Sequence, residues 1–188
     1  MRRTVGWVLG TVLLLAAVVI RADDYSDAAD LFRNAGESRT FFKTCYGYAI
    51  FPGIGKGGFV VGGAHGNGRV YVHDRYVGDT SMTQLSVGFQ AGGQAYTQII
   101  FFQDKRAFDE FAKGDFEFGA DVNAVAITAA AGGSVGTAGA SAGASGGMKD
   151  ATTAGKYYKG MAVFTIVKGG AMYQATVAGQ KFSYTPKP

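Results

Sequence analysis

Residues 47–63 have the sequence GYAIFPGIGKGGFVVGG, and this stretch decides the fold class. Within it, residues 53–58 match the pattern G-x-G-x-x-G of a dinucleotide-binding loop. That loop needs a helix directly after it, because the helix N-terminus holds the pyrophosphate. Residues 59–63 instead favour another β-strand, since they combine Phe and Val with glycine. We therefore interpret the glycines as bends and close backbone contacts in a curved sheet.

Outward from this stretch, short segments rich in Val, Ile, Phe and Tyr alternate with glycines. The segments that we predict to be strands are residues 46–51, 59–64, 69–73, 84–91, 95–102, 160–167, 171–177 and 181–184. Polar and apolar residues also alternate over 116–130, which indicates a strand with one face in water. Asn67 and Gly68 both tolerate positive φ, so we predict a two-residue hairpin turn there.

Helices are predicted at two places. Residues 23–43 place apolar side chains on one helical face, and residues 104–112 begin at a good N-cap, Asp104. Residues 129–147 contain only Ala, Gly, Ser and Thr apart from Val135, which is compatible with a flexible loop or with a tightly packed ribbon. Many short strands and few helices favour a mainly β fold of the α+β kind. We expect a barrel-like antiparallel sheet with glycine-rich bends, flanked by an N-terminal amphipathic helix and one or two short helices.

The N-terminus has the pattern of an export signal. Arg2 and Arg3 precede an apolar run over residues 5–20, and Ala22 offers a small residue before a cleavage site. The run is short for a membrane span of about 20 apolar residues, so we expect residues 1–22 to be removed and residues 23–188 to be periplasmic or secreted. An uncleaved signal that anchors the chain is the alternative.

Removal of this signal changes the charge of the chain. Without Arg2, Arg3 and Arg21, the 18 Lys and Arg become 15 against 14 Asp and Glu, a net charge of +1 instead of +4. A chain so close to neutral lacks the broad basic surface of a nucleic-acid-binding protein, and we exclude that class of partner.

The remaining motifs carry no catalytic chemistry. The pattern G-x-S-x-G occurs at 139–143 and 143–147, but inside a tract built from those residue types. The one cysteine, Cys45, excludes an internal disulfide, and two histidines on one predicted hairpin make no metal site. The carboxylates between 109 and 121 fit a solvated surface. We therefore expect no enzymatic activity, no cofactor and no metal ion.

Residues 47–63, followed by Gly66-Asn67-Gly68, resemble the SYLF domain family of lipid-binding proteins. The resemblance continues through four further segments and covers almost all of the chain after the signal; these are residues 88–93, 114–119, 159–164 and 179–184. It implies a single β-rich domain without enzymatic activity. Eukaryotic relatives bind phosphoinositide membranes through an N-terminal amphipathic helix and basic residues, and some bind actin.

The chain departs from those relatives in three ways. We expect an export signal and no appended adaptor module, and four aspartates lie in the first turns of its first predicted helix. Export removes a cytoplasmic actin role, and the acidic helix start weakens an expectation of phosphoinositide selectivity. The resemblance then implies the exported bacterial type of the domain, with a phospholipid or another amphiphile as its ligand.

A lipid contact needs apolar side chains together with cations near phosphate, because either contribution alone is weak. The end of the first predicted helix and the start of the second offer both, and Lys56 could donate to a headgroup beside backbone N–H groups of the glycine-rich stretch. The candidate lipid-binding residues are Lys56, Lys43, Phe41, Phe42, Lys105 and Arg106. Neighbouring phenylalanines are by default core residues. The alternative function is a structural or protein-interaction protein of the bacterial envelope without lipid affinity, and homo-oligomerisation stays open.

Overall fold

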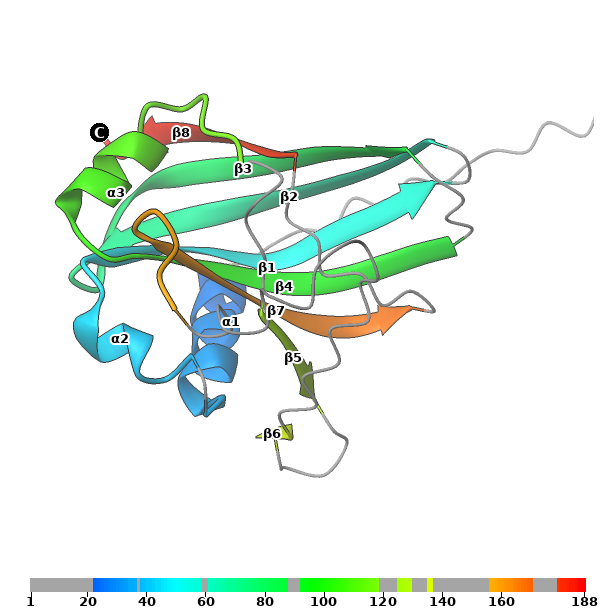
Figure 1. The fold of residues 1–188 in the computed structure, drawn as a ribbon, viewed down its shortest axis with the longest axis horizontal. Coiled ribbons are helices and arrows are strands. Elements are labelled where there is room, and N and C mark those ends of the chain that lie inside the picture. Colours follow the sequence, from blue (N-terminus) through cyan, green and yellow to red (C-terminus); the bar gives the residue numbers. More distant parts are fainter. Residues whose placement is uncertain are drawn as a thin grey trace, which may run out of the picture.

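The computed structural model describes residues 22–36, 38–58, 61–87, 92–118, 125–129, 135–136, 156–170 and 179–188. Eight strands form one sheet in the order β6-β5-β7-β4-β1-β2-β3-β8 (Figure 1). Their bounds are β1 Gly47–Gly58, β2 Val61–Val72, β3 Arg75–Val87, β4 Gly92–Phe102, β5 Val125–Ala129, β6 Val135–Gly136, β7 Met161–Gly170 and β8 Gln180–Pro186. All neighbours are antiparallel except β5 and β7. The predicted mainly β fold is confirmed.

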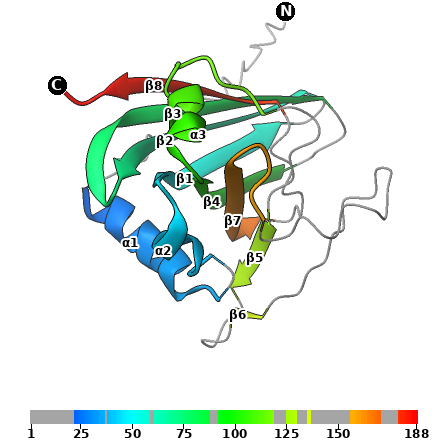
Figure 2. The same ribbon diagram turned by 60° about the vertical axis from the view of Figure 1, so that its left-hand side comes forward.

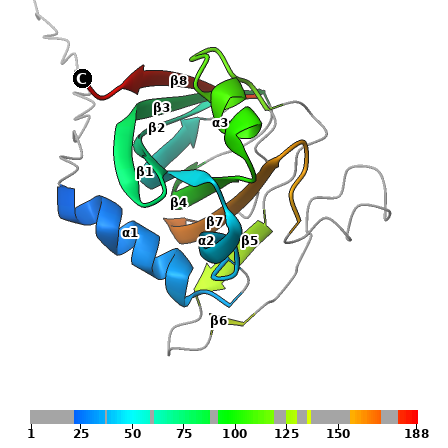
Figure 3. The same ribbon diagram turned by 90° about the vertical axis from the view of Figure 1, so that its left-hand side faces the viewer.

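The sheet curls around a concave face but is not closed, because β6 and β8 end the strand order of the described residues. Figures 2 and 3 show this curl from two sides, with α3 (Lys105–Phe111) inside one end of it and α1 (Ala22–Asn34) and α2 (Phe41–Thr44) outside. The sheet therefore separates two cores.

The outer core lies between the sheet and the first two helices. From α1 and α2 it takes Tyr25, Ala28, Phe32, Ala35 and Phe41, which pack on outward side chains of β1, β4 and β7. The inner core lies on the concave face and is rich in phenylalanine. Its largest members are Phe51, Phe102, Phe111, Phe118, Met82 and Phe182. Because α3 contributes Phe111 and Ala107 to this core, it covers the concave face at one end.

The hairpin turn predicted at Asn67-Gly68 is wrong, because β2 runs without interruption through both residues. A Cβ on Gly68 would lie 2.6 Å from the ring of Phe51, so this glycine serves close packing and makes no turn. The chain reverses instead at His73 and Asp74, which adopt φ angles of 47° and 59° between β2 and β3. Polar side chains can occupy this left-handed region at moderate cost, which allows the turn without glycine.

The single helix predicted over 23–43 is wrong in length, because it is two helices. The first ends at Asn34, and the buried Ser38 hydroxyl donates a 2.6 Å hydrogen bond to the carbonyl of Phe32. Such a bond satisfies a carbonyl at the helix end and holds the connection to α2 against α1. The predicted cap of α3 is confirmed, since the Asp104 carboxylate accepts a 2.8 Å hydrogen bond from the backbone N–H of Ala107.

Several predictions fall outside the described residues: the export signal at 1–21, the strand at 171–177, residues 119–124 of the alternating segment and most of the Gly/Ala/Ser tract. In the part of the chain that is described, no helix is long and apolar enough to cross a membrane.

Candidate functional site

Lys56 is a cation on the concave face of the sheet. Along this part of β1, Ile54 and Lys56 point inward while Gly55 and Gly57 are exposed, and Lys56 is only 7% exposed. Burial lowers the pKa of its ammonium group from the ordinary value, because charge is costly in a poorly solvated environment. Within the described residues, no carboxylate forms an ion pair with Lys56.

The strand register places other buried polar residues beside Lys56. Lys56 pairs with Ala64 of β2, Ala64 pairs with Gln84 of β3, and Gln84 pairs with Gln180 of β8. All four residues are buried, so this row crosses four strands on the concave face with three polar side chains.

Gln180 also reaches across the concave face to β4. Gln98 Nε2 donates to Gln180 Oε1 at 2.9 Å, and Gln180 Nε2 donates to Gln98 Oε1 at 3.1 Å. Gln180 Nε2 donates further to the Tyr96 hydroxyl at 3.3 Å, and burial raises the pKa of that hydroxyl. Since β1, β2 and β3 separate β4 from β8, this amide pair ties the two sides of the curl together.

We call Lys56, Gln84, Tyr96, Gln98 and Gln180 the polar layer. It lies on the same face as the aromatic inner core, which continues from it toward α3. Thr165 is beside Gln98 in the register, and its buried hydroxyl has no hydrogen-bond partner. The concave face therefore carries a buried hydroxyl without a hydrogen-bond partner, on Thr165, and a largely buried lysine without an ion pair among the described residues, Lys56.

The aromatic candidates at the end of the first predicted helix are largely core residues. Phe41 is buried, with its ring 5.4 Å from that of Phe101 and 5.0 Å from that of Phe164. Phe42 is half-buried and packs edge-on against Phe101 at 4.9 Å. Lys43, the next residue, is exposed. In this conformation, the residues that could meet a lipid surface there are Lys43 and one side of Phe42.

The basic candidates on α3 are exposed, and each lies near an acidic neighbour. Lys105 Nζ is 2.7 Å from Asp109 Oδ2, and Arg106 Nη2 is 3.9 Å from Asp104 Oδ2. Exposed pairs of this kind are weak because water and salt screen them, so both cations remain available to an anionic surface.

The candidates divide between the two ends of the sheet. Gly47 of β1 pairs with Phe102 of β4, so the end where β1 begins is also the end where α2 and α3 lie (Figure 1). Lys43, Lys105 and Arg106 belong to this end. Lys56 is nine residues further along β1, roughly 30 Å away at about 3.3 Å per residue. The structure does not bring Lys56 together with the other candidates.

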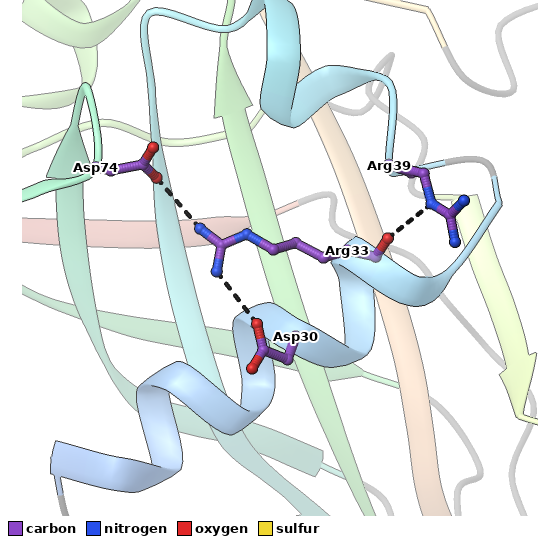
Figure 4. Close-up of polar contacts among 4 residues, drawn as sticks. All are labelled: Asp30, Arg33, Arg39 and Asp74. Carbon is purple, nitrogen blue, oxygen red and sulfur yellow. Dashed lines mark hydrogen bonds and ion pairs between the residues drawn. The ribbon is translucent and has the colours of Figure 1, made fainter.

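A polar cluster attaches α1 to the β2–β3 turn (Figure 4). Arg33 forms ion pairs of 3.2 Å with both Asp30 and Asp74, and its carbonyl accepts a 3.0 Å hydrogen bond from Arg39 Nε. The Arg33 guanidinium also lies 4.8 Å from the ring centre of Phe42. These contacts hold the helix and fix the exposed edge of Phe42.

Sequence analysis missed the polar layer apart from Lys56. Gln98 lies in the apolar run of residues 95–102, where a neutral polar side chain facing inward is a usable signal. Gln180 comes 82 residues later, so only the fold shows that the two amides meet. Cys45 is half-buried, and burial raises the pKa of its thiol to about 11. No cluster of metal-ligating side chains occurs among the described residues.

Comparison with known proteins identifies the family. Residues 83–185 match the family model Ysc84, described as Las17-binding protein actin regulator. The chain is also 29% identical over 154 residues to Beta cell expansion factor A of Aeromonas veronii, and the alignment covers 81% of this chain and 51% of that protein. The chain thus spans about half the length of this curated relative. Because the family model matches more than half of the chain, the protein belongs to the Ysc84 (SYLF) domain family.

Proposed function

We propose that this protein is an exported, non-enzymatic lipid-binding module that associates with phospholipid membranes through basic and aromatic residues. Membership of the SYLF family supports the proposal, because the family is linked to lipid binding. The observation within the chain that carries it is the set of exposed cations at one end of the sheet, Lys43, Lys105 and Arg106. A lipid headgroup supplies a charge of the opposite sign.

The exposed cations near α2 and α3 fit a peripheral contact with a membrane. Lys43, Lys105 and Arg106 lie at one end of the sheet and could approach anionic headgroups together, at about 1 kcal/mol per basic residue near such a surface. Phe42 supplies a partly exposed ring beside them. The gain is modest, so we expect reversible binding that depends on salt.

Vesicle flotation of residues 23–188 tests this function. This segment contains every described helix and strand except Ala22, the first residue of α1. It also lacks the apolar run of residues 5–20, which would bind vesicles by itself. We expect the segment to float with vesicles that contain anionic phospholipid and much less with neutral vesicles. Lys43→Met should weaken flotation, whereas the matched control Lys113→Met, an exposed lysine paired with Glu110, should not. Absence of flotation with all vesicles would contradict the proposal.

A protein-interaction role in the envelope is the second candidate. The family description names a protein partner, and Leu85 on β3 offers an apolar side chain that is 82% exposed. This candidate predicts a stable oligomer or complex in light scattering together with no response to vesicles. Intact mass of the protein recovered from culture medium or periplasm tests the proposed export, since cleavage before Asp23 would remove residues 1–22.

A further inference from the structure

The concave face contains a feature that a peripheral membrane contact does not use. Lys56 is buried there at the end of the sheet opposite α2 and α3, so a flat membrane that meets Lys43 does not also meet Lys56. Its burial requires another explanation, and its surroundings provide one.

A largely buried lysine without a counter-charge is unfavourable for a fold. Taking its charge out of water destabilises the folded chain unless an opposite charge and hydrogen bonds compensate. Apolar side chains of similar volume, such as Met, would fill the same position without this cost. A lysine at position 56 is therefore explained when an anion binds beside it.

The residues around Lys56 can complete such a site. Gln84 lies in the same row on the concave face, and an amide group can donate hydrogen bonds to an anion. Two residues further along the strands, this face carries Gly58, Gly62 and Gly92, which have no side chains to cover Lys56. The register thus places Lys56 and the Gln84 amide in one row of the concave face, and glycines two residues further along the strands.

We propose that Lys56 binds the phosphate or carboxylate group of a single amphiphile on the concave face of the sheet. This inference rests on the proposed lipid-binding function and names the group that the protein holds and the face on which it holds it. The Gln98–Gln180 pair and the packed aromatic core beyond it leave no room for an acyl chain in the direction of α3. The apolar part of the ligand therefore extends toward the glycines.

A short-chain ligand below its micelle concentration tests the inference in the full chain without a membrane. The probe is dihexanoyl phosphatidic acid, with inorganic phosphate and the neutral detergent octyl glucoside as separate arms. Thermal unfolding and equilibrium dialysis would be measured for wild type, for Lys56→Met and for the matched control Lys181→Met. Lys181 is one position from Gln180 on the same end of the sheet, but it is exposed and pairs with Glu117 at 3.5 Å.

We expect phosphatidic acid to raise the melting temperature of wild type and of Lys181→Met, and to leave that of Lys56→Met unchanged. The dissociation constant for phosphatidic acid should be at least about tenfold larger for Lys56→Met than for wild type. An equal rise with inorganic phosphate alone would assign the site to a free anion and overturn its lipid part. Equal binding by wild type and Lys56→Met, or an equal effect of octyl glucoside, would overturn the inference.

Chemical labelling provides a second readout that needs no variant. Acetylation of Lys56 in wild type, followed by mass spectrometry, should slow when phosphatidic acid is bound, while acetylation of Lys181 should not. Unchanged labelling at Lys56 would contradict the site even if a variant failed to fold. If residues 23–188 float with anionic vesicles but phosphatidic acid has no effect at Lys56, the inference fails and the proposed function stands. If neither occurs, both fail.

Discussion

The Gln98–Gln180 amide pair predicts a strong coupling between two distant strands. Both side chains are fully buried, and two reciprocal hydrogen bonds of 2.9 and 3.1 Å join them across the concave face. Replacing one glutamine by leucine keeps the volume similar but leaves the other amide with an unpaired donor and acceptor. Each unsatisfied buried group costs about 1–3 kcal/mol, and the added apolar surface offsets part of this.

We expect each single variant to lower the free energy of unfolding by about 2.5 kcal/mol. Gln180→Leu should be the worse of the two, because it also removes the hydrogen bond to the Tyr96 hydroxyl. The double variant Gln98→Leu/Gln180→Leu leaves no unpaired amide between these positions, so its total loss should be about 2 kcal/mol. The implied coupling energy is about 3 kcal/mol, the upper end for residues in direct contact.

Urea unfolding followed by far-UV circular dichroism measures all four proteins of this cycle. The wild type and the three variants must share the same denaturant slope for the comparison to hold. Single-variant losses that simply add in the double variant would refute the reasoning, since they would mean that the two amides do not satisfy each other.

Three further predictions concern glycine packing, thiol chemistry and pH. Gly68→Ala should lower the free energy of unfolding by about 1–3 kcal/mol, because its Cβ would lie 2.6 Å from the Phe51 ring. A Cβ on Gly55 would have nothing within 4 Å, so Gly55→Ala should change the free energy of unfolding by less than about 1 kcal/mol. Urea unfolding of both variants measures the difference. Cys45 should react with iodoacetamide at pH 8 about 100-fold more slowly in the folded chain than in urea, because burial raises the pKa of its thiol from 9.0 to about 11. Equal alkylation rates in the two states, measured by mass spectrometry, would contradict this. The free energy of unfolding of wild type should rise relative to that of Lys56→Met as pH increases toward 10.5. Burial lowers the pKa of Lys56, so the folded chain binds fewer protons than the unfolded chain as pH approaches 10.5. A difference in free energy that stays constant between pH 7 and 10 would contradict this prediction.

The regular features of the fold follow from local sequence. Segments rich in Val, Ile, Phe and Tyr between glycines predicted most of the strands, and Asp104 predicted the start of α3, because strand composition and helix capping depend on neighbouring residues. The turn at His73-Asp74 was not predicted from the sequence, because neither of its two residues with positive φ is a glycine. The turn predicted at Asn67-Gly68 was wrong. Gly66 and Gly68 are required instead for close packing against Ile54 and Phe51 of the neighbouring strand.

The site was less accessible to sequence reasoning. Lys56 was singled out for its place in the glycine-rich stretch, but its burial depends on four strands that meet only in the folded sheet. Lys56 and Lys43 were both named as lipid-binding candidates, and β1 places them at opposite ends of the sheet. Phe41 behaves as the default for adjacent aromatics predicts, with its ring in the outer core.

Salt-dependent flotation of residues 23–188 with anionic vesicles is the most direct measurement of the central claim. Cations near α2 and α3 act on headgroups through charge, and salt screens exposed charges within about 10 Å at 0.1 M ionic strength. We predict clear flotation at low salt that falls by at least about threefold at physiological salt. No flotation at either salt concentration would contradict the lipid-binding account and leave the SYLF domain here as a fold with a protein-interaction role.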